Sequence, residues 1–256
     1  MTRVKAVLAM VLAVAALFAA PAAAQQLTPE PDALDAAVAS ATEGGGLSKR
    51  IVQMFLMVTV LSLAPGIAMM VTCLPFMLIV LSILRQGVGL QQAPPNMLIV
   101  TLALFLTYYV MDPVFTAAWQ DGIQPMLENA LPIEEGFVRT LAPFRGFMAA
   151  RLDPETFDAM AALRADVAAD QVSPEAPLSV LVPSFLLSEV SRAFQIGFLI
   201  FLPFLIIDLV VAAILMSMGM MMVPPAIVSL PFKLAFFVVA DGWALVTSSL
   251  VRGYLG

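Results

Sequence analysis

Apolar residues occupy long blocks of the chain, separated by polar breaks. The blocks cover residues 51–84, 97–111, 178–218 and 226–251. None alternates apolar and polar residues with the period of two that a membrane β-strand shows, so the pattern predicts helices. We therefore predict an all-α integral membrane protein with four apolar helical blocks, packed as helical hairpins.

The first block is longer than one helix needs to cross a hydrocarbon core of ~30 Å. It contains no charged residue, but Pro65-Gly66 and Pro75 interrupt it. Proline inside a helix removes a backbone hydrogen bond and bends or ends the helix. This block is therefore expected to be either one broken helix or two short helices.

The N-terminus has the features of a secretory signal peptide. Arg3 and Lys5 precede a short apolar stretch, residues 6–20, and small residues follow it. This arrangement predicts a cleaved signal peptide at 1–24, with cleavage between Ala24 and Gln25. The alternative is an uncleaved first span, for which the apolar stretch is short.

Polar segments divide the rest of the chain. Residues 112–175 hold eleven acidic residues and only four arginines. Placing Arg85 on the cytoplasmic side follows the positive-inside rule and puts this acidic segment in the periplasm. The predicted parts are a polar periplasmic linker at 25–50, a first apolar helical hairpin at 51–111, an acidic periplasmic loop at 112–177 and a second apolar helical hairpin at 178–256.

The composition excludes several classes of function. Apolar residues make up 61% of the chain and charged residues 12%, against about 25% charged in soluble domains. There is no histidine and only one cysteine, Cys73. Histidine metal sites, Ser-His or Cys-His nucleophiles and an internal disulfide are therefore excluded. We predict no catalytic residue, no metal and no cofactor.

Five charged residues lie inside the apolar last third of the chain. They are Glu189, Arg192, Asp208, Lys233 and Asp241. A charge at the centre of a bilayer costs roughly 2.5–3.5 kcal/mol on insertion scales, so these side chains are expected to be paired, hydrated or packed against protein. For Asp208 and Asp241, a proton relay and a structural hydrogen bond to backbone or Trp243 both remain open.

A methionine cluster lies between the two arms of the second hairpin. Met220, Met221 and Met222 follow Gly219, which permits a helix break, and precede Pro224-Pro225, which prevent simple continuation. Methionine is unbranched, flexible and apolar, so it repacks around different shapes. A ring of such loops could exclude water from a pore. The simpler interpretation is ordinary apolar packing.

A second polar pattern lies on the first arm of this hairpin. Ser184, Ser188, Ser191 and Gln195 recur at heptad-like spacing and form a polar stripe. Hydrogen bonds between helices are the simpler explanation, and lining a conduit is the other.

Nine motifs, spread in order over about half the chain, are long and unusual. They are residues 79–85, 89–96, 102–107, 111–114, 193–197, 203–208, 215–222, 229–233 and 241–243. In these motifs the chain resembles the FliP family, the P subunit of the flagellar type III export gate, whose injectisome counterpart is SctR. The resemblance implies five P subunits that assemble with the export gate's Q and R subunits into a closed, cone-like conduit.

The resemblance also implies roles for particular residues. Glu189 and Lys233 match residues that form an ion pair between adjacent subunits. Arg192, Gln195, Asp208 and Asp241 are expected to be buried polar or structural residues. The residues matching the family's methionine gasket are Met216, Met218, Met220, Met221 and Met222.

The sequence departs from the family pattern at two points. An arginine of the family is absent where this chain reads Leu74-Pro75-Phe76, which puts any ion pair of that arginine in doubt. The basic residue after Glu189 is at Arg192, one position later than the pattern has it.

The resulting expectation is a non-enzymatic pore subunit in the bacterial inner membrane, within the flagellar basal body. Its expected partners are copies of itself, five in number as the resemblance implies, the Q and R subunits, other basal-body export components, unfolded flagellar substrates and membrane lipid, with no nucleic acid. Two other functions remain as alternatives. One is the injectisome version of the same subunit, and the other is a proton-coupled small-solute transporter, which should show an internal repeat that the two halves lack.

Overall fold

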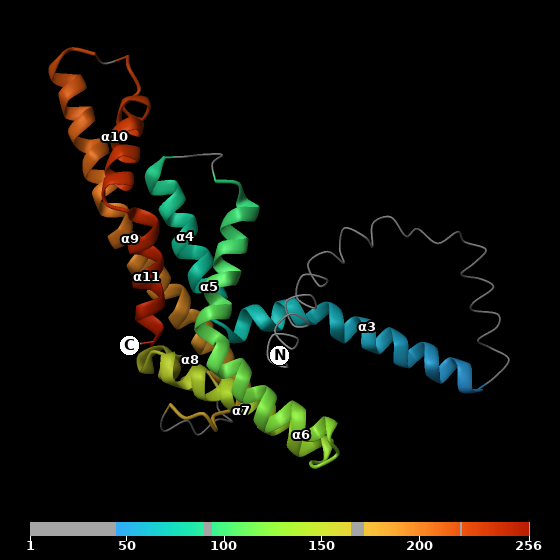
Figure 1. Cartoon of the computed structure of the whole chain (residues 1–256). Coiled ribbons are helices and arrows are strands. Elements are labelled where there is room, and N and C mark those ends of the chain that lie inside the picture. Colours follow the sequence, from blue (N-terminus) through green and yellow to red (C-terminus); the bar gives the residue numbers. More distant parts are fainter. Residues whose placement is uncertain (1–44, 90–93, 165–171, 221, 256) are drawn as a thin grey trace, which may run out of the picture. The chain divides into compact units, whose positions relative to one another are not determined.

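The computed structural model describes residues 45–89, 94–164, 172–220 and 222–255, and every regular element in these ranges is a helix. The all-α prediction is therefore confirmed for this part of the chain. The predicted signal peptide and its cleavage site, Ala24 and Gln25, lie outside the described residues, as does Met221. The elements are α3 (Gly45–Val71), α4 (Leu74–Val88), α5 (Asn96–Ala117), the π-helix η1 (Ala118–Ile123), α6 (Gln124–Leu127), α7 (Ile133–Arg151), α8 (Pro154–Ala162), α9 (Leu178–Ser217), α10 (Pro225–Val239) and α11 (Gly242–Leu255) (Figure 1).

The chain divides into two compact units, Met1–Ala68 and Met69–Gly256. In the first unit, α3 leaves large apolar side chains such as Met54 and Phe55 exposed. The hydroxyl of Thr59 donates to the carbonyl of Phe55, 2.8 Å away within the same helix. The second unit contains the remaining helices and all the candidate site residues described below.

The first apolar block forms two helices. α3 ends at Val71 and α4 begins at Leu74. Pro75 lies in the first turn of α4, where proline is tolerated because that turn's N–H groups have no helical partner. The chain remains helical through Pro65-Gly66. The block therefore forms two helices, of which α4 is short and α3, at 27 residues, is not, and the break lies beside the second proline.

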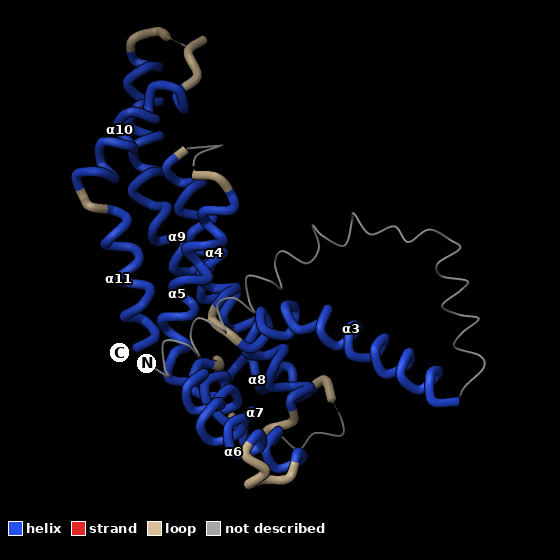
Figure 2. The backbone as a smooth tube through the Cα atoms, turned by 45° about the vertical axis from the view of Figure 1, so that its right-hand side comes forward, coloured by secondary structure: helices blue, strands red, loops and turns tan. Residues whose placement is uncertain are grey.

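The core of the second unit forms where α4 packs against α5 and α9 (Figure 2). Along α4, Met77, Val80, Leu81 and Leu84 are buried at the three- and four-residue spacing of one helix face. The largest buried side chains on the partner helices include Met111 of α5 and Phe204 of α9. This packing holds α9 against most of the length of α4. It thereby positions the helix that carries most of the candidate site.

The segment predicted as an acidic loop contains several helices. α5 continues through η1 into α6, and α7 and α8 follow. A second buried cluster forms where α7 and α8 meet the start of α9, and its members include Met148, Phe157, Leu181 and Phe185. The acidic segment is thereby attached to α9 by an apolar core.

Asp153 caps the N-terminus of α8. Its Oδ2 accepts hydrogen bonds from the backbone N–H of Thr156 at 3.0 Å and from the Thr156 hydroxyl at 2.7 Å. These hydrogen bonds favour the carboxylate and lower the pKa of Asp153 below its ordinary value. The stabilisation from this cap is therefore present above the ordinary pKa and is lost as pH falls through the lowered pKa.

Two described helices are long and apolar enough to cross a membrane. They are the continuous helical segment Asn96–Leu127 and α9, Leu178–Ser217. α10 and α11 form a third candidate if the pair, bent by 61°, counts as one span. α4, at 15 residues, is shorter. The described residues thus support a membrane protein with two or three apolar spans, while the arrangement in four blocks and two hairpins stays a prediction.

We expect Gly122→Ala to destabilise the contact between η1 and α7. A Cβ at Gly122 would lie 2.6 Å from the backbone nitrogen and 2.7 Å from the Cα of Thr140, so the backbone would have to move. The expected loss is about 1–3 kcal/mol, as for overpacked cores. Gly146→Ala on α7 is the control, because its Cβ would meet nothing within 4 Å. Thermal unfolding of the purified variants in detergent measures both, and an unchanged midpoint for Gly122→Ala would contradict the close approach.

Candidate functional site

The charged residues predicted from the sequence fall into two groups along α9. Glu189 lies in the first half of the helix with Arg192, and Asp208 lies in the second half, opposite Lys233 of α10. Residues 216–222, which we call the methionine loop, begin at the C-terminal end of α9. These three features are described in turn.

Asp208 joins α9 to α10 through two side chains. The Lys233 Nζ lies 2.6 Å from Asp208 Oδ2, and the Ser229 hydroxyl donates to Asp208 Oδ1 at 2.5 Å. Ser229 and Lys233 are four residues apart on α10 and so share one helix face. The Lys233 side chain is 7% exposed and that of Asp208 is 38% exposed. We call these three residues the hairpin clamp.

Glu189 is completely buried and has partners from three helices. The Tyr254 hydroxyl of α11 donates to Glu189 Oε2. Glu189 Oε1 lies 3.6 Å from Arg151 Nε of α7 and 3.8 Å from Arg192 Nη1 one turn along α9. A buried carboxylate needs such partners, because an unpaired charge in the interior is strongly unfavourable.

Arg151 completes this group, which we call the Glu189 cluster. Its guanidinium carbon lies 4.0 Å from the centre of the Tyr254 ring, a cation–π arrangement. Its Nη1 donates to the carbonyl of Gly253 at 2.7 Å. Arg151 therefore ties the end of α7 to the end of α11 as well as facing Glu189.

Glu189 and Lys233 have different partners within one chain. Lys233 binds Asp208, and Glu189 is held by Arg151, Arg192 and Tyr254. The predicted Glu189–Lys233 pair joins two subunits, and a single chain does not test it. It stays a prediction, and Asp208 is the competing partner that sequence reasoning did not assign to Lys233.

Other predicted residues are exposed in the single chain. Gln195 lies on the exposed face of α9, and Asp241 is exposed at the bend between α10 and α11 with φ of 47°. The Asp241 backbone carbonyl accepts from the Leu245 N–H at 3.0 Å, at the start of α11. The predicted burial of these two side chains would require neighbouring subunits and remains a prediction.

The polar stripe is divided between two environments. Ser184 and Ser188 are buried, whereas Ser191 is exposed. The Ser188 hydroxyl donates to the Ser184 carbonyl at 2.8 Å and accepts from the Asp153 N–H at 3.1 Å. The stripe's first half therefore holds the start of α8 against α9.

Arg151 and Tyr254 were missed from the sequence. Arg151 belongs to the acidic segment, and Tyr254 follows the last apolar block, so no local pattern links either to Glu189. Where the family pattern has an arginine, Phe76 packs edge-on against the Tyr254 ring with centroids 5.3 Å apart. An aromatic side chain thus lies beside the Glu189 cluster at that place.

The methionine loop forms the turn between α9 and α10 (Figure 2). Gly219 has φ of 75°, a left-handed conformation that glycine adopts without steric strain. Pro225 lies in the first turn of α10. The side chains of Met216, Met218, Met220 and Met222 are all exposed, Met222 by 97%. Four large apolar side chains therefore project from a turn that glycine and proline define.

No group of three or more histidine, cysteine, aspartate or glutamate residues that could hold a metal occurs in the described part of the chain. The candidate site consists of ion pairs, hydrogen bonds and exposed apolar side chains.

The two described helices of membrane-crossing length support the class of α-helical membrane proteins. The model of the FliP family matches residues 57–250, and the chain belongs to this family. The match includes α4 to α10, the hairpin clamp and the methionine loop.

Relatives at high identity agree with this membership. The chain is 47% identical over 211 residues to the flagellar biosynthetic protein FliP of Caulobacter vibrioides, covering 82% of this chain and 79% of that protein. It is 49% identical over 214 residues to the Agrobacterium fabrum protein of the same name, covering 82% and 86%. For the Bacillus subtilis protein of that name, identity is 41% over 203 residues, covering 79% and 91%.

Proposed function

We propose that the chain is a pore-forming subunit of the flagellar type III export gate in the inner membrane. The observation that carries the proposal is the methionine loop, in which exposed apolar side chains project from the hairpin tip. The FliP family membership and the flagellar names of the relatives support it. The subunit does no covalent chemistry; it builds and seals a passage for unfolded flagellar subunits.

The sealing role follows from the properties of methionine. Met216, Met218, Met220 and Met222 expose apolar surface that a soluble monomer would normally bury. In a ring of subunits, these side chains, with Met221, face one another and exclude water from the narrowest part of the conduit. Their flexibility lets the ring deform around a passing chain.

The assembly is proposed to contain five copies of this chain with Q and R subunits in the flagellar basal body. Glu189 of one subunit and Lys233 of the next form an ion pair at the interface in this proposal. Because both side chains are buried and already paired within the chain, assembly requires an exchange or sharing of partners. Other basal-body export components and unfolded flagellar substrates are the remaining proposed partners.

The two alternatives are not favoured. The matched relatives named above are flagellar proteins, which argues against the injectisome version. A proton-coupled transporter would use Asp208 as a proton carrier, but its two oxygens are bound by Lys233 and Ser229. No observation in the described structure favours transport of a small solute.

Complementation of a strain lacking its own copy of this gene tests the proposed function. Expression of the chain is expected to restore swimming and the secretion of flagellin into the medium. A chain lacking residues 216–222 should be inserted in the membrane without restoring either. Normal flagellin secretion from that deletion would overturn the proposal.

Cleavage of the signal peptide is a separate prediction. The short apolar stretch and the alanine-rich site place the cut between Ala24 and Gln25. N-terminal sequencing of the membrane-extracted protein is expected to begin at Gln25. Ala24→Arg removes the small residue at the site and should leave the precursor uncut, whereas recovery of wild-type protein with an intact N-terminus would refute the cleavage.

A further inference from the structure

The methionine loop carries sulfur atoms that an oxidant can reach. Met222 is 97% exposed, and the other described methionines of the loop are exposed as well: Met216, Met218 and Met220. In contrast, three methionines of the buried clusters are at most 1% exposed: Met77, Met111 and Met148. Because an oxidant must touch a sulfur atom to react with it, the two groups differ in susceptibility. The loop presents four accessible thioethers within seven residues.

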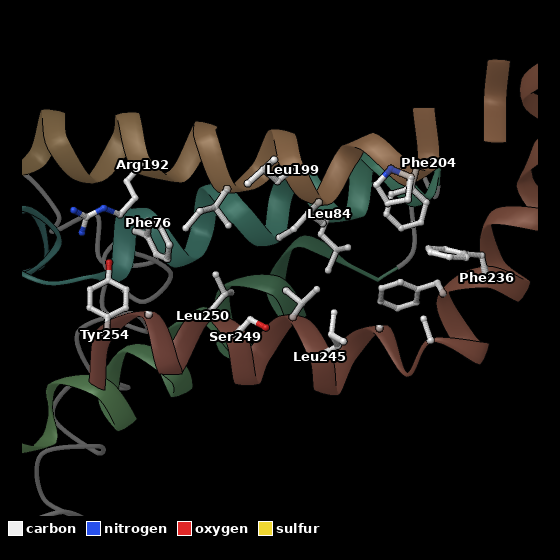
Figure 3. A pocket seen from close by; sticks show the side chains of 18 of the residues that line it. Phe76, Leu84, Arg192, Leu199, Phe204, Phe236, Leu245, Ser249, Leu250 and Tyr254 are labelled. Atoms are coloured by element: carbon white, nitrogen blue, oxygen red, sulfur yellow. The ribbon is translucent and has the colours of Figure 1, made fainter. Parts of the chain in front are cut away.

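The apolar slot between α4, α9, α10 and α11 does not take up these side chains (Figure 3). None of the residues that line the slot is a methionine. Phe204 and Phe236 lie together at one end of it. Along α9 and α10, Asp208 and Lys233 of the hairpin clamp stand between that end and the loop. The thioethers of the loop therefore stay outside the packed part of the hairpin.

The turn keeps its shape without help from the methionine side chains. The Gly219 N–H donates to the Met216 carbonyl at 3.1 Å, and the Met220 N–H donates to the Leu215 carbonyl at 3.0 Å. No described methionine of the loop belongs to either buried cluster. A chemical change at these sulfur atoms therefore alters the surface of the loop and leaves the packing of the helices intact.

The tip of the hairpin has no polar side chain that could bind a sulfoxide. No residue between Asp208 and Lys233 is charged. Ser217 is the only polar residue of the loop, and its hydroxyl donates to the Ile214 carbonyl at 2.7 Å within the same helix. A polar oxygen left without a hydrogen bond in apolar surroundings is unfavourable. Sulfoxide oxygens in this loop would therefore draw in water.

Hydrogen peroxide is an oxidant of the right size and chemistry. A lone pair of the methionine sulfur attacks one peroxide oxygen, so that an S–O bond forms and the O–O bond breaks. The departing hydroxide takes the proton of the new S–OH group and leaves as water. Sulfur thus loses two electrons to the peroxide and becomes the polar sulfoxide. Peroxide is uncharged and close to water in size, and a seal between two aqueous compartments has water on both of its faces.

We propose that the methionine loop is a site of oxidation by peroxide, and that its sulfoxide form no longer excludes water from the conduit. Four exposed thioethers in a turn without polar partners carry the proposal. The loss of the seal rests on the proposed function of the loop, whereas the oxidation itself does not. The exported chain would then no longer be the only solute that crosses an oxidised gate.

The first experiment maps oxidation in the assembled protein. Membranes that contain the full-length protein are treated with hydrogen peroxide, and its peptides are searched by mass spectrometry for the mass of one added oxygen per methionine. Residues 216–222 are expected to oxidise well before the buried Met77, Met111 and Met148. Oxidation of the loop no faster than that of these three methionines would overturn the proposal.

The second experiment measures leakage of ions before and after peroxide. Treated wild type is expected to leak at least as fast as an untreated variant with alanine at 220–222. Leucine cannot form a sulfoxide, so a variant with leucine at 216, 218, 220, 221 and 222 should stay tight under the same treatment. Met97→Leu is the matched control, because Met97 is 82% exposed on α5 outside the loop. This control should leak after treatment as the wild type does.

The two experiments separate this inference from the proposed function. If the treated leucine variant leaks as much as the treated wild type, the damage lies outside the loop and the inference is wrong. If the loop oxidises and stays tight while the alanine variant leaks, the sulfoxide is tolerated and the inference fails alone. If the loop oxidises and neither it nor the alanine variant leaks, the sealing function itself is wrong, and the loss of the seal on oxidation fails with it.

Discussion

Asp208→Ala is expected to destabilise the protein by about 3 kcal/mol, the lower end of the range for breaking a buried ion pair. The reason is that Lys233, with a side chain only 7% exposed, would lose its carboxylate partner at 2.6 Å. The lower end applies because Asp208 itself is 38% exposed and solvent screens part of the interaction. Unfolding of the purified subunit by denaturant in detergent measures the loss.

The matched control removes the charge together with its partner. Asp208→Ala combined with Lys233→Met leaves no buried charge unpaired and should recover most of the stability. If the double variant is as unstable as Asp208→Ala alone, loss of packing rather than of the ion pair is the cause.

Lys233 also allows the two candidate partners to be compared. Exchanging the charges of Asp208 and Lys233 should restore the stability of the isolated subunit that reversing either charge alone removes. Glu189→Lys or Lys233→Glu alone should reduce assembly and motility, and the combined exchange should recover part of that loss, as in a double-mutant cycle. An exchange between Glu189 and Lys233 that is no better than the worse single variant would exclude their pairing across subunits.

Replacing Met220, Met221 and Met222 together with alanine is expected to produce a gate that assembles but leaks. The exposed methionines of the loop are not part of the core of the second unit, so assembly should persist. Alanine removes most of the apolar bulk that excludes water from a narrow passage. Two quantities are measured in cells that express the variant. One is the leakage of ions or small solutes, and the other is the export of flagellin.

Leucine at the same three positions is the matched control. It keeps the apolar surface but loses the flexibility of the methionine side chain. The gate should then remain tight and export flagellin slowly. A triple-alanine gate that assembles normally and is as ion-tight as the wild type would make ordinary packing the better explanation of these methionines.

The helical character of the chain was predictable because it depends on local pattern. Blocks of apolar residues marked α5 and α9, and Pro75 marked the start of α4 closely. The methionine turn was also predictable, since Gly219 and Pro224-Pro225 constrain the backbone where they stand. By contrast, α3 continues through Pro65-Gly66, so these two residues interrupt a long apolar helix less than the sequence pattern predicted.

The partners of the charged residues were not predictable in the same way. Arg192 is three residues from Glu189, so helical spacing could have linked them. Arg151 and Tyr254 reach Glu189 only because α7 and α11 end beside α9. Asp208 and Lys233 meet because two helices are folded back on one another, and sequence reasoning had assigned Lys233 only to Glu189.

The hairpin clamp also has a mechanical consequence. Asp208 is nine residues before the end of α9, and Lys233 is eight residues after the start of α10, distances of ~14 Å and ~12 Å along the helices. Beyond this brace, each arm is a short helical segment, and Pro231 removes one backbone hydrogen bond from the α10 arm. Because both arms are short, lateral force on the loop has little leverage to spread them. The side chains at the tip and the turn around Pro231 are therefore the parts of the hairpin that deform most easily.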